Sequence, residues 1–294
     1  MINNKFNREI LKKFIDPKIV DEFIKDPKKI SIGGVKRNHT ILFSDISQFS
    51  SLCEILEPQE LFYFLNDYLS IMFAIISKNN GTVLDMDFDS ITVIFGTPNY
   101  LENHFELACR TSIEMKNENI AHIISKYTNI TKNHFFTRIG INQGEMIVGY
   151  HGCLSRLKYS AFGNSVSLGS RFLRYCLKYG TQIMTSGESL YSLSDKLIYR
   201  PLDYIRIVGL NTPIRLCEII DFRNNAKKET IEIINLFNNA GELFDNRNWK
   251  EANKLYKIVL ESRPNDKVVK FYIDRCNEYQ NNPPSEHWDG VYNM

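Results

Sequence analysis

Two predicted strands that each end in carboxylates place the strongest constraint on how this chain can fold. Residues 39–45 read His-Thr-Ile-Leu-Phe-Ser-Asp, an apolar strand pattern that ends at Asp45. Residues 81–95 read as a hairpin whose tip carries Asp-Met-Asp-Phe-Asp and ends at Asp89. Carboxylates at the ends of neighbouring strands can hold two divalent metal ions against a triphosphate. Such a pair makes phosphate chemistry possible with little help from other side chains.

The rest of the central region predicts strands joined by hairpins and interleaved with helices. A turn is predicted at 142–145, Asn-Gln-Gly-Glu, because these residue types favour turns. This order predicts an α+β fold in which helices cover one face of an antiparallel sheet. The other predicted helices cover 8–25, 59–78, 102–127 and 164–178, and the other predicted strands cover 136–141, 146–150, 158–162, 181–185, 197–208 and 213–220.

The C-terminal region changes to helices alone, predicted at 227–244, 248–262 and 266–280. The sequence Asn-Trp-Lys-Glu-Ala at 248–252 resembles the start of a tetratricopeptide-type repeat. One repeat cannot bury its own apolar face, so these helices must pack on the central domain or on a partner subunit. The extended tail is predicted to dock through Trp288.

These patterns predict three regions: a basic helical leader at 1–38, a central domain at 39–222, and C-terminal helices with a tail at 223–294. A net charge of +2 over 294 residues gives no indication of a nucleic-acid partner. The six cysteines include no C-x-x-C pair, so a zinc site is not expected. We expect instead a cytoplasmic protein whose cysteines are reduced. The apolar run 61–76 is too short to span a bilayer; we expect a buried helix and no transmembrane segment.

Six sequence blocks resemble the class III adenylate and guanylate cyclases in order and spacing. The blocks lie at 40–46, 94–98, 138–145, 148–149, 159–171 and 213–215, and the resemblance extends over about 20–294. It implies the catalytic-domain fold of that family, with a ferredoxin-like antiparallel sheet. It also implies a nucleoside triphosphate substrate, a 3′,5′-cyclic nucleotide product with pyrophosphate, and a homodimer whose two protomers share each active site.

The same resemblance assigns site residues. Asp45, Ile46 and Asp89 match the residues that bind two divalent metal ions, Mn²⁺ or Mg²⁺. Arg171 matches the arginine that stabilises charge on the α-phosphate. Phe49 belongs to a turn expected to offer backbone N–H groups to the phosphates.

Several positions depart from the family pattern. Ser167 stands in place of an asparagine and can still donate one hydrogen bond, whereas Leu210 replaces the lysine that binds the terminal phosphates. Gln48 and Phe88 each replace a glycine. These departures favour a second hypothesis, a catalytically impaired homologue that acts as a regulatory or dimerisation partner. A scaffold that binds peptides through the helical repeat is the weakest alternative.

Base recognition is predicted to depart from the adenylyl pattern. Asp85 stands where adenylyl members have a lysine, and Ser160 stands where they have Asp or Thr. A carboxylate only accepts hydrogen bonds, so it suits guanine, uracil or cytosine better than the N1 atom of adenine. The resemblance extends to a bacterial anti-phage branch that makes cyclic UMP or cyclic CMP, which would signal to a downstream effector. Phe88 suits a one-ring base, and the predicted order is pyrimidine, then guanine, then adenine.

Overall fold

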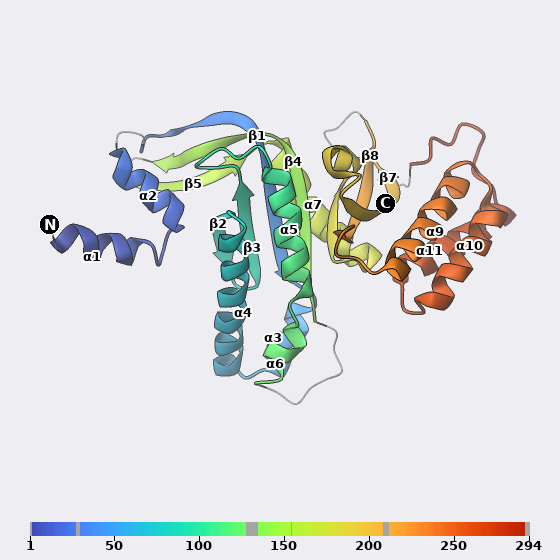
Figure 1. Ribbon diagram of the computed structural model, residues 1–294, viewed down its shortest axis with the longest axis horizontal. Helices are drawn as coiled ribbons and strands as arrows, with labels where there is room; N and C mark the ends of the chain where they lie inside the picture. The colour runs from blue at the N-terminus through green and yellow to red at the C-terminus, as the bar shows by residue number, and fades with distance from the viewer. Residues whose placement is uncertain (1, 28–29, 128–134, 154, 208–211, 292–294) are drawn as a thin grey trace. The chain divides into compact units, whose positions relative to one another are not determined.

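The computed structural model describes residues 2–27, 30–127, 135–153, 155–207 and 212–291 (Figure 1). The chain separates into two compact units, Met1–Leu173 and Arg174–Met294. Each unit combines strands with helices, as the α+β prediction requires. The domain boundaries predicted after residues 38 and 222 stay predictions.

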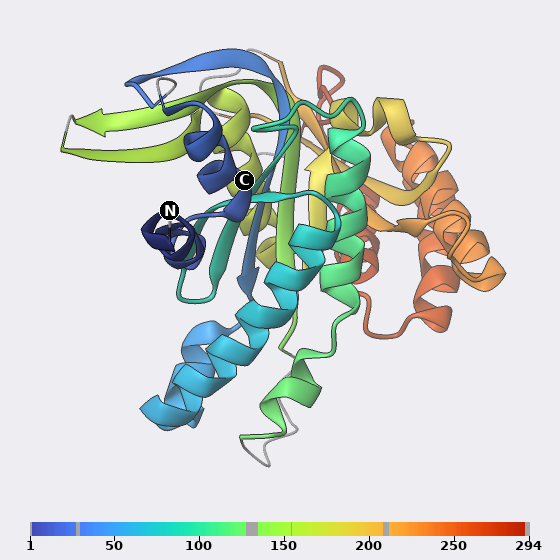
Figure 2. The same ribbon diagram turned by 60° about the vertical axis from the view of Figure 1, so that its left-hand side comes forward.

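An antiparallel sheet forms the centre of the first unit. Its strands follow the order β2, β3, β1 and β4, and β5 pairs with the second half of β4. In Figure 2 the yellow-green β4–β5 hairpin reaches away from the cyan helix α4. The strand bounds are β1 (Gly33–Ile46), β2 (Thr82–Asp87), β3 (Ser90–Phe95), β4 (Thr137–Cys153) and β5 (Arg156–Phe162).

The pairing of β1 with β4 is continuous and corrects the predicted turn at 142–145. The register runs from Gly33 opposite Tyr150 to Ile46 opposite Thr137 without a break. The segment stays extended because β1 pairs with each of its four residues, and the Asn142 side chain donates to the backbone oxygen of Ser165 at 2.9 Å. Turn-favouring residue types were outweighed by a complete ladder of backbone hydrogen bonds. The strand predicted to start at 39 likewise begins earlier, at Gly33.

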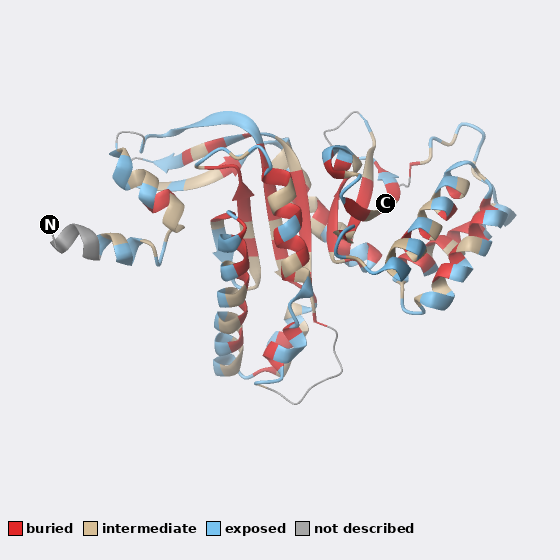
Figure 3. Ribbon diagram, viewed as in Figure 1, coloured by how far each residue is buried: buried red, intermediate tan, exposed pale blue. Residues whose placement is uncertain are grey.

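Helices lie on both faces of this sheet, not on one as predicted: α7 (Asn164–Tyr179) lies against Ile41 and Phe43, and α4 and α5 cover the opposite face (Figure 3). The residues of β1, β3 and β4 that are buried under them include Leu42, Val93 and Ile141. The helix predicted at 102–127 is divided, because the chain leaves helical geometry at Glu118. The helix bounds are α3 (Phe49–Ile55), α4 (Pro58–Lys78), α5 (His104–Asn117) and α6 (Ile120–Ile124).

Helix α4 contains the apolar run and is buried on one side only. Phe64, Tyr68, Met72 and Ile76 are buried at a spacing of four, whereas Phe62 is 60% exposed. Among the described residues, α4 is the helix that is long and apolar enough to cross a membrane by length and composition alone, with 21 residues and a mean hydropathy of 1.2 over an 18-residue window. Only 28% of that window is buried, and core helices of soluble proteins pass the same test of length and composition.

The leader forms two helices, α1 (Ile2–Leu11) and α2 (Pro17–Lys25), instead of the single helix predicted at 8–25. Asp16 separates them because its carboxylate accepts from the Lys18 backbone N–H at 2.9 Å and so caps α2, with proline at the first helical position. The same carboxylate accepts from the Val83 backbone N–H at 2.8 Å. The leader is therefore tied to the start of β2.

The second unit holds a smaller antiparallel sheet and the C-terminal helices. Within it β8 pairs with both β6 and β7, and α9 contacts β7. Helices α9, α10 and α11 match the three predicted C-terminal helices to within one residue at each end. The bounds are β6 (Ile183–Ser186), α8 (Gly187–Leu190), β7 (Leu197–Ile205), β8 (Ile214–Phe222), α9 (Lys228–Asp245), α10 (Trp249–Ser262) and α11 (Lys267–Asn281), and α7 (Asn164–Tyr179) begins in the first unit.

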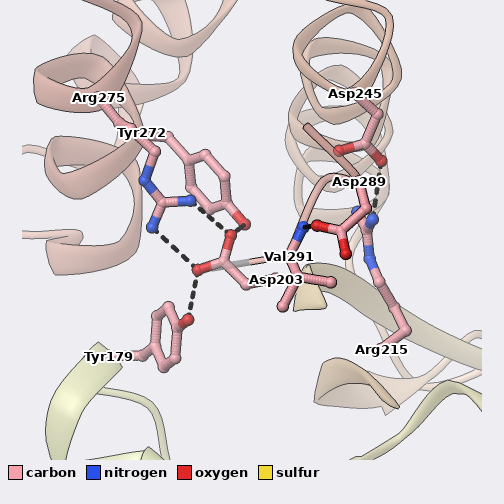
Figure 4. A network of polar contacts seen from close by, with 8 residues as sticks. All are labelled: Tyr179, Asp203, Arg215, Asp245, Tyr272, Arg275, Asp289 and Val291. Carbon is pink, nitrogen blue, oxygen red and sulfur yellow. Dashed lines mark hydrogen bonds and ion pairs between the residues drawn. The ribbon is translucent and has the colours of Figure 1, made fainter. Parts of the chain in front are cut away.

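A buried ion pair fastens α11 to β7 (Figure 4). The Arg275 guanidinium donates to both carboxylate oxygens of Asp203, at 2.6 and 2.9 Å, and both side chains are 5% exposed. The hydroxyls of Tyr272 and Tyr179 also donate to this carboxylate. The C-terminal helices thus pack on strands of their own unit. The predicted docking of Trp288 is confirmed, since its ring lies 5.5 Å from that of Tyr279.

Replacing Asp203 with alanine tests this anchor. We expect Asp203→Ala to lower the free energy of unfolding by about 3–5 kcal/mol, because it leaves the buried Arg275 guanidinium without its counter-charge. Glu251→Ala is the matched control: it removes an ion pair with Lys254 whose side chains are 47% and 60% exposed, and should cost at most about 1 kcal/mol. Urea unfolding measures both. Equal losses for the two variants would contradict the anchoring role.

Candidate active site

Asp45 lies near the end of β1, directly opposite Arg138 on β4. The Arg138 guanidinium donates to both carboxylate oxygens, Nε to Oδ1 at 2.7 Å and Nη2 to Oδ2 at 2.6 Å. The two side chains are 13% and 19% exposed, so this is a largely desolvated, bidentate pair. The sequence prediction gave Arg138 no role. The role of Arg138 follows from its position opposite Asp45 on the neighbouring strand, and a sequence pattern alone does not fix that pairing.

Asp89 follows the tip of the β2–β3 hairpin and reaches the same strand end. Its carboxylate oxygen Oδ2 accepts from the backbone N–H of Ile46 at 3.3 Å. The tip residue Phe88 has a φ of +50°, in the left-handed region, which glycine adopts with less strain than a residue with a side chain. The structure therefore brings together three residues predicted as metal ligands: Asp45, Ile46 and Asp89.

The cluster of Asp45, Asp89 and Arg138 contains two carboxylates and one guanidinium, so negative charge exceeds positive charge. Burial raises the pKa of Asp45, and the hydrogen bonds and charge of Arg138 oppose that rise. Burial also raises the pKa of Asp89; the hydrogen bond from Ile46 lowers it, and the negative charge of Asp45 raises it again. The two carboxylates are thus close enough to repel each other, and a bound cation would relieve that repulsion.

The donor set fits a hard divalent cation such as Mg²⁺ or Mn²⁺, which prefers oxygen ligands. Asp45 and Asp89 would supply carboxylate oxygens, and Ile46 a backbone carbonyl. Within the described parts of the chain no group of three or more His, Cys, Asp and Glu side chains is placed to hold a metal. Magnesium commonly takes one or two carboxylates together with water and substrate phosphates, so two acids are enough.

The turn that follows is pinned to the start of β4. The Ser47 backbone N–H donates to the Phe136 oxygen at 2.8 Å, and the Phe136 N–H donates to Ser47 Oγ at 3.0 Å. Gln48 has a φ of +58°, so this chain places a side chain where left-handed geometry favours glycine. Phe49 then begins helix α3, at the position where the phosphate-binding turn was predicted.

Ser167 and Arg171 lie four residues apart on α7 and therefore share one face of the helix. The helix rests closely on the sheet because two glycines face each other there. A Cβ on Gly140 would clash with the Gly169 backbone, and one on Gly169 would lie 3.2 Å from Ile41 and Phe43. The predicted catalytic residues thus come from an element that lies on β1, the strand carrying Asp45.

Asp85 is not the isolated acceptor that the sequence predicted. Its Oδ2 atom lies 2.6 Å from Nζ of Lys158 on β5, and the two side chains are 54% and 49% exposed. Ser160 lies two residues beyond Lys158 on the same strand, so both side chains point to the same face. Strands β2 and β5 therefore bring Asp85 close to Lys158, and no hydrogen bond joins Asp85 to Ser160 among the described residues.

Leu210 lies outside the described residues. Arg206, Lys158 and Arg156 are cations that the sequence offers in place of the missing phosphate-binding lysine. Lys158 is engaged with Asp85, and the Arg206 guanidinium is paired with Asp289.

The sequence matches the model of the adenylate and guanylate cyclase catalytic domain over residues 35–209. The chain belongs to this family. It is 27% identical over 205 residues to adenylate cyclase 1 of Rhizobium meliloti (strain 1021), which covers 66% of this chain and 31% of that protein. It is 28% identical over 221 residues to an adenylate cyclase of Anabaena cylindrica, covering 74% and 43% respectively. The chain thus spans less than half the length of these curated relatives.

Two solved cyclase structures match over nearly their whole length. The guanylyl cyclase Cya2 superimposes with a TM-score of 0.58 at 27% identity, covering 67% of this chain and 98% of that one. The adenylyl cyclase CyaB from P. aeruginosa gives the same TM-score and identity, covering 67% of this chain and 100% of its own. The predicted class III catalytic fold is confirmed. The tetratricopeptide-like character of the C-terminal helices stays a prediction.

The raised pKa values of Asp45 and Asp89 predict how metal binding depends on pH. Protons compete with the metal for both carboxylates, and a pKa above the ordinary value of 3.8 makes that competition begin at a higher pH. We expect Mn²⁺ affinity, measured by electron paramagnetic resonance, to fall as the pH is lowered from about 7 to about 5. Circular dichroism checks that the fold persists. An affinity that stays constant down to about pH 5 would contradict the raised values.

Proposed function

We propose that this protein is a metal-dependent nucleotidyl cyclase, which converts a nucleoside triphosphate into a 3′,5′-cyclic nucleotide and pyrophosphate. The observation that carries the proposal is the convergence of Asp45, Ile46 and Asp89 at one strand end of a cyclase-family fold. The relatives named above are adenylate or guanylate cyclases. Their activity supports the reaction class proposed here.

The side chains divide the chemistry between them. Asp45 and Asp89 would hold the metal ions, and Arg138 fixes the orientation of the Asp45 carboxylate through two hydrogen bonds. When bound, the two ions lower the pKa of the sugar hydroxyl and stabilise charge on the triphosphate. Arg171 supplies a fixed positive charge for the α-phosphate and Ser167 one hydrogen-bond donor. Phe49 offers its backbone N–H to the phosphates.

We further propose that the active form is a homodimer in which two protomers contribute to each site. Ser167 and Arg171 come from α7, and the metal-binding residues come from β1 and the β2–β3 hairpin. A chain that carries both groups can form two equivalent sites in a twofold dimer.

Base preference is proposed in the order pyrimidine, guanine, adenine. The support is chemical: Asp85 and Ser160 replace the adenine-reading residues, and Asp85 presents a carboxylate on β2. This pair of residues is the basis for three further proposals: a preference for UTP or CTP, a role in anti-phage signalling, and a downstream effector. Phe88 adds less than predicted. Its side chain is 72% exposed, and it is not among the described residues that line the cavity beside Asp85.

The activity test uses the purified chain with Mn²⁺ or Mg²⁺ and each of the four ribonucleoside triphosphates in turn. We expect a 3′,5′-cyclic product, detected by mass spectrometry, and at least about a hundredfold less of it with Asp45→Asn, the scale of losing a preorganised electrostatic contact. Asp87→Asn is the matched control, because Asp87 is an exposed acid in the same hairpin and should leave the rate unchanged.

Two outcomes would contradict the proposal. An Asp45→Asn variant as active as the wild type would remove the metal-binding role. Nucleotide binding without product from any of the four substrates would instead support the impaired homologue, a regulatory or dimerisation partner.

A further inference from the structure

A cavity of about 610 Å³ lies beside Asp85, within the first unit. This volume is within the range usual for small-molecule sites. One wall is the leader and the other is formed by β2 and the β4–β5 hairpin. The residues that matter for its chemistry are Lys12, Phe14 and Phe23 of the leader and Asp85, Lys158 and Tyr159 of the sheet.

The leader wall is held in place by specific contacts. Asp16 accepts the Val83 backbone N–H, and the Lys18 ammonium donates to the Gly81 oxygen at 2.6 Å. Ile19 and Val20 are 3% and 0% exposed, so α2 is packed as firmly as a core helix. The α2 part of this wall is therefore fixed against the start of β2.

The polar edge of the cavity is the ion pair of Asp85 and Lys158. It places one acceptor group and one donor group side by side, 2.6 Å apart. The Watson–Crick edge of every nucleobase also carries a donor and an acceptor next to each other. A phosphate would be repelled by Asp85 and a metal ion by Lys158, so this edge suits an uncharged polar ring better than either ion.

The leader supplies an aromatic surface beside that edge. Phe14 lines the cavity, and its side chain is 82% exposed, although an aromatic ring favours burial. A nucleobase that stacks on this ring would cover it, as aromatic side chains do in many sites that bind single bases. An exposed Phe ring next to a paired donor and acceptor is the combination that base recognition requires.

We propose that Lys158 and the leader residue Phe14 bind the base of the nucleotide, Lys158 by donating to its edge and Phe14 by stacking on its face. The inference rests on the proposed nucleotidyl cyclase activity and extends it. The basic leader becomes part of the substrate site, and Lys158 becomes a residue that determines base specificity together with Asp85.

The test compares Lys158→Met and Phe14→Ser with wild type, using the rates with all four triphosphates. We expect KM for the preferred substrate to rise at least about fivefold in each variant, the scale of one lost base contact, with kcat little changed. The differences in KM among the four triphosphates should become smaller in Lys158→Met. Lys158→Arg should keep both these differences and the order of preference. Lys36→Met is the matched control, since it removes an exposed ion pair with Glu145 at 2.7 Å on neighbouring strands and should change neither value.

Unchanged KM and unchanged base order in both variants would overturn the inference while leaving the activity intact. If wild type makes no product from any substrate, the proposed activity fails and the inference is judged by binding. Calorimetry then measures the Kd of each triphosphate. Weaker binding to Lys158→Met than to Lys36→Met supports the site, and equal affinities overturn it.

Discussion

The register between β1 and β4 is the constraint on which the rest of the first unit depends. One uninterrupted antiparallel alignment sets Arg138 opposite Asp45. It also places Gly140 under α7, where a larger residue would push the helix away from the sheet. A slip by one residue would turn every side chain of the strand to the opposite face and would separate the arginine from the carboxylate. The catalytic proposal thus begins with backbone pairing.

That alignment produces a site with two acids and one fixed counter-charge. Arg138 pairs directly with Asp45, whereas Asp89 accepts hydrogen bonds from backbone N–H groups, including that of Ile46, and senses the Arg138 charge without contact. Partial burial raises the pKa of both carboxyl groups, and their mutual repulsion adds to the rise for Asp89. Divalent cations and the charged end of a nucleotide would together restore balance, which is why the arrangement suits a reaction on a triphosphate.

The sequence predicted those parts of the molecule that depend on local pattern. The three C-terminal helices follow from apolar periodicity, and the meeting of Asp45 with Asp89 follows from their positions at strand ends. The prediction of a turn at 142–145 was wrong, because composition cannot show that β1 supplies a backbone pairing partner for each of these residues. Arg138 and Lys158 were missed as partners for a related reason: both meet their carboxylates across strands distant in sequence.

A crystal of the protein with Mn²⁺ and a non-cyclisable triphosphate analogue tests the central claim most directly. The account predicts anomalous-scattering peaks for manganese at about 2.0–2.3 Å from oxygens of both Asp45 and Asp89, with the triphosphate bound at the same strand end. An analogue bound elsewhere, with both carboxylates free of manganese, would contradict it.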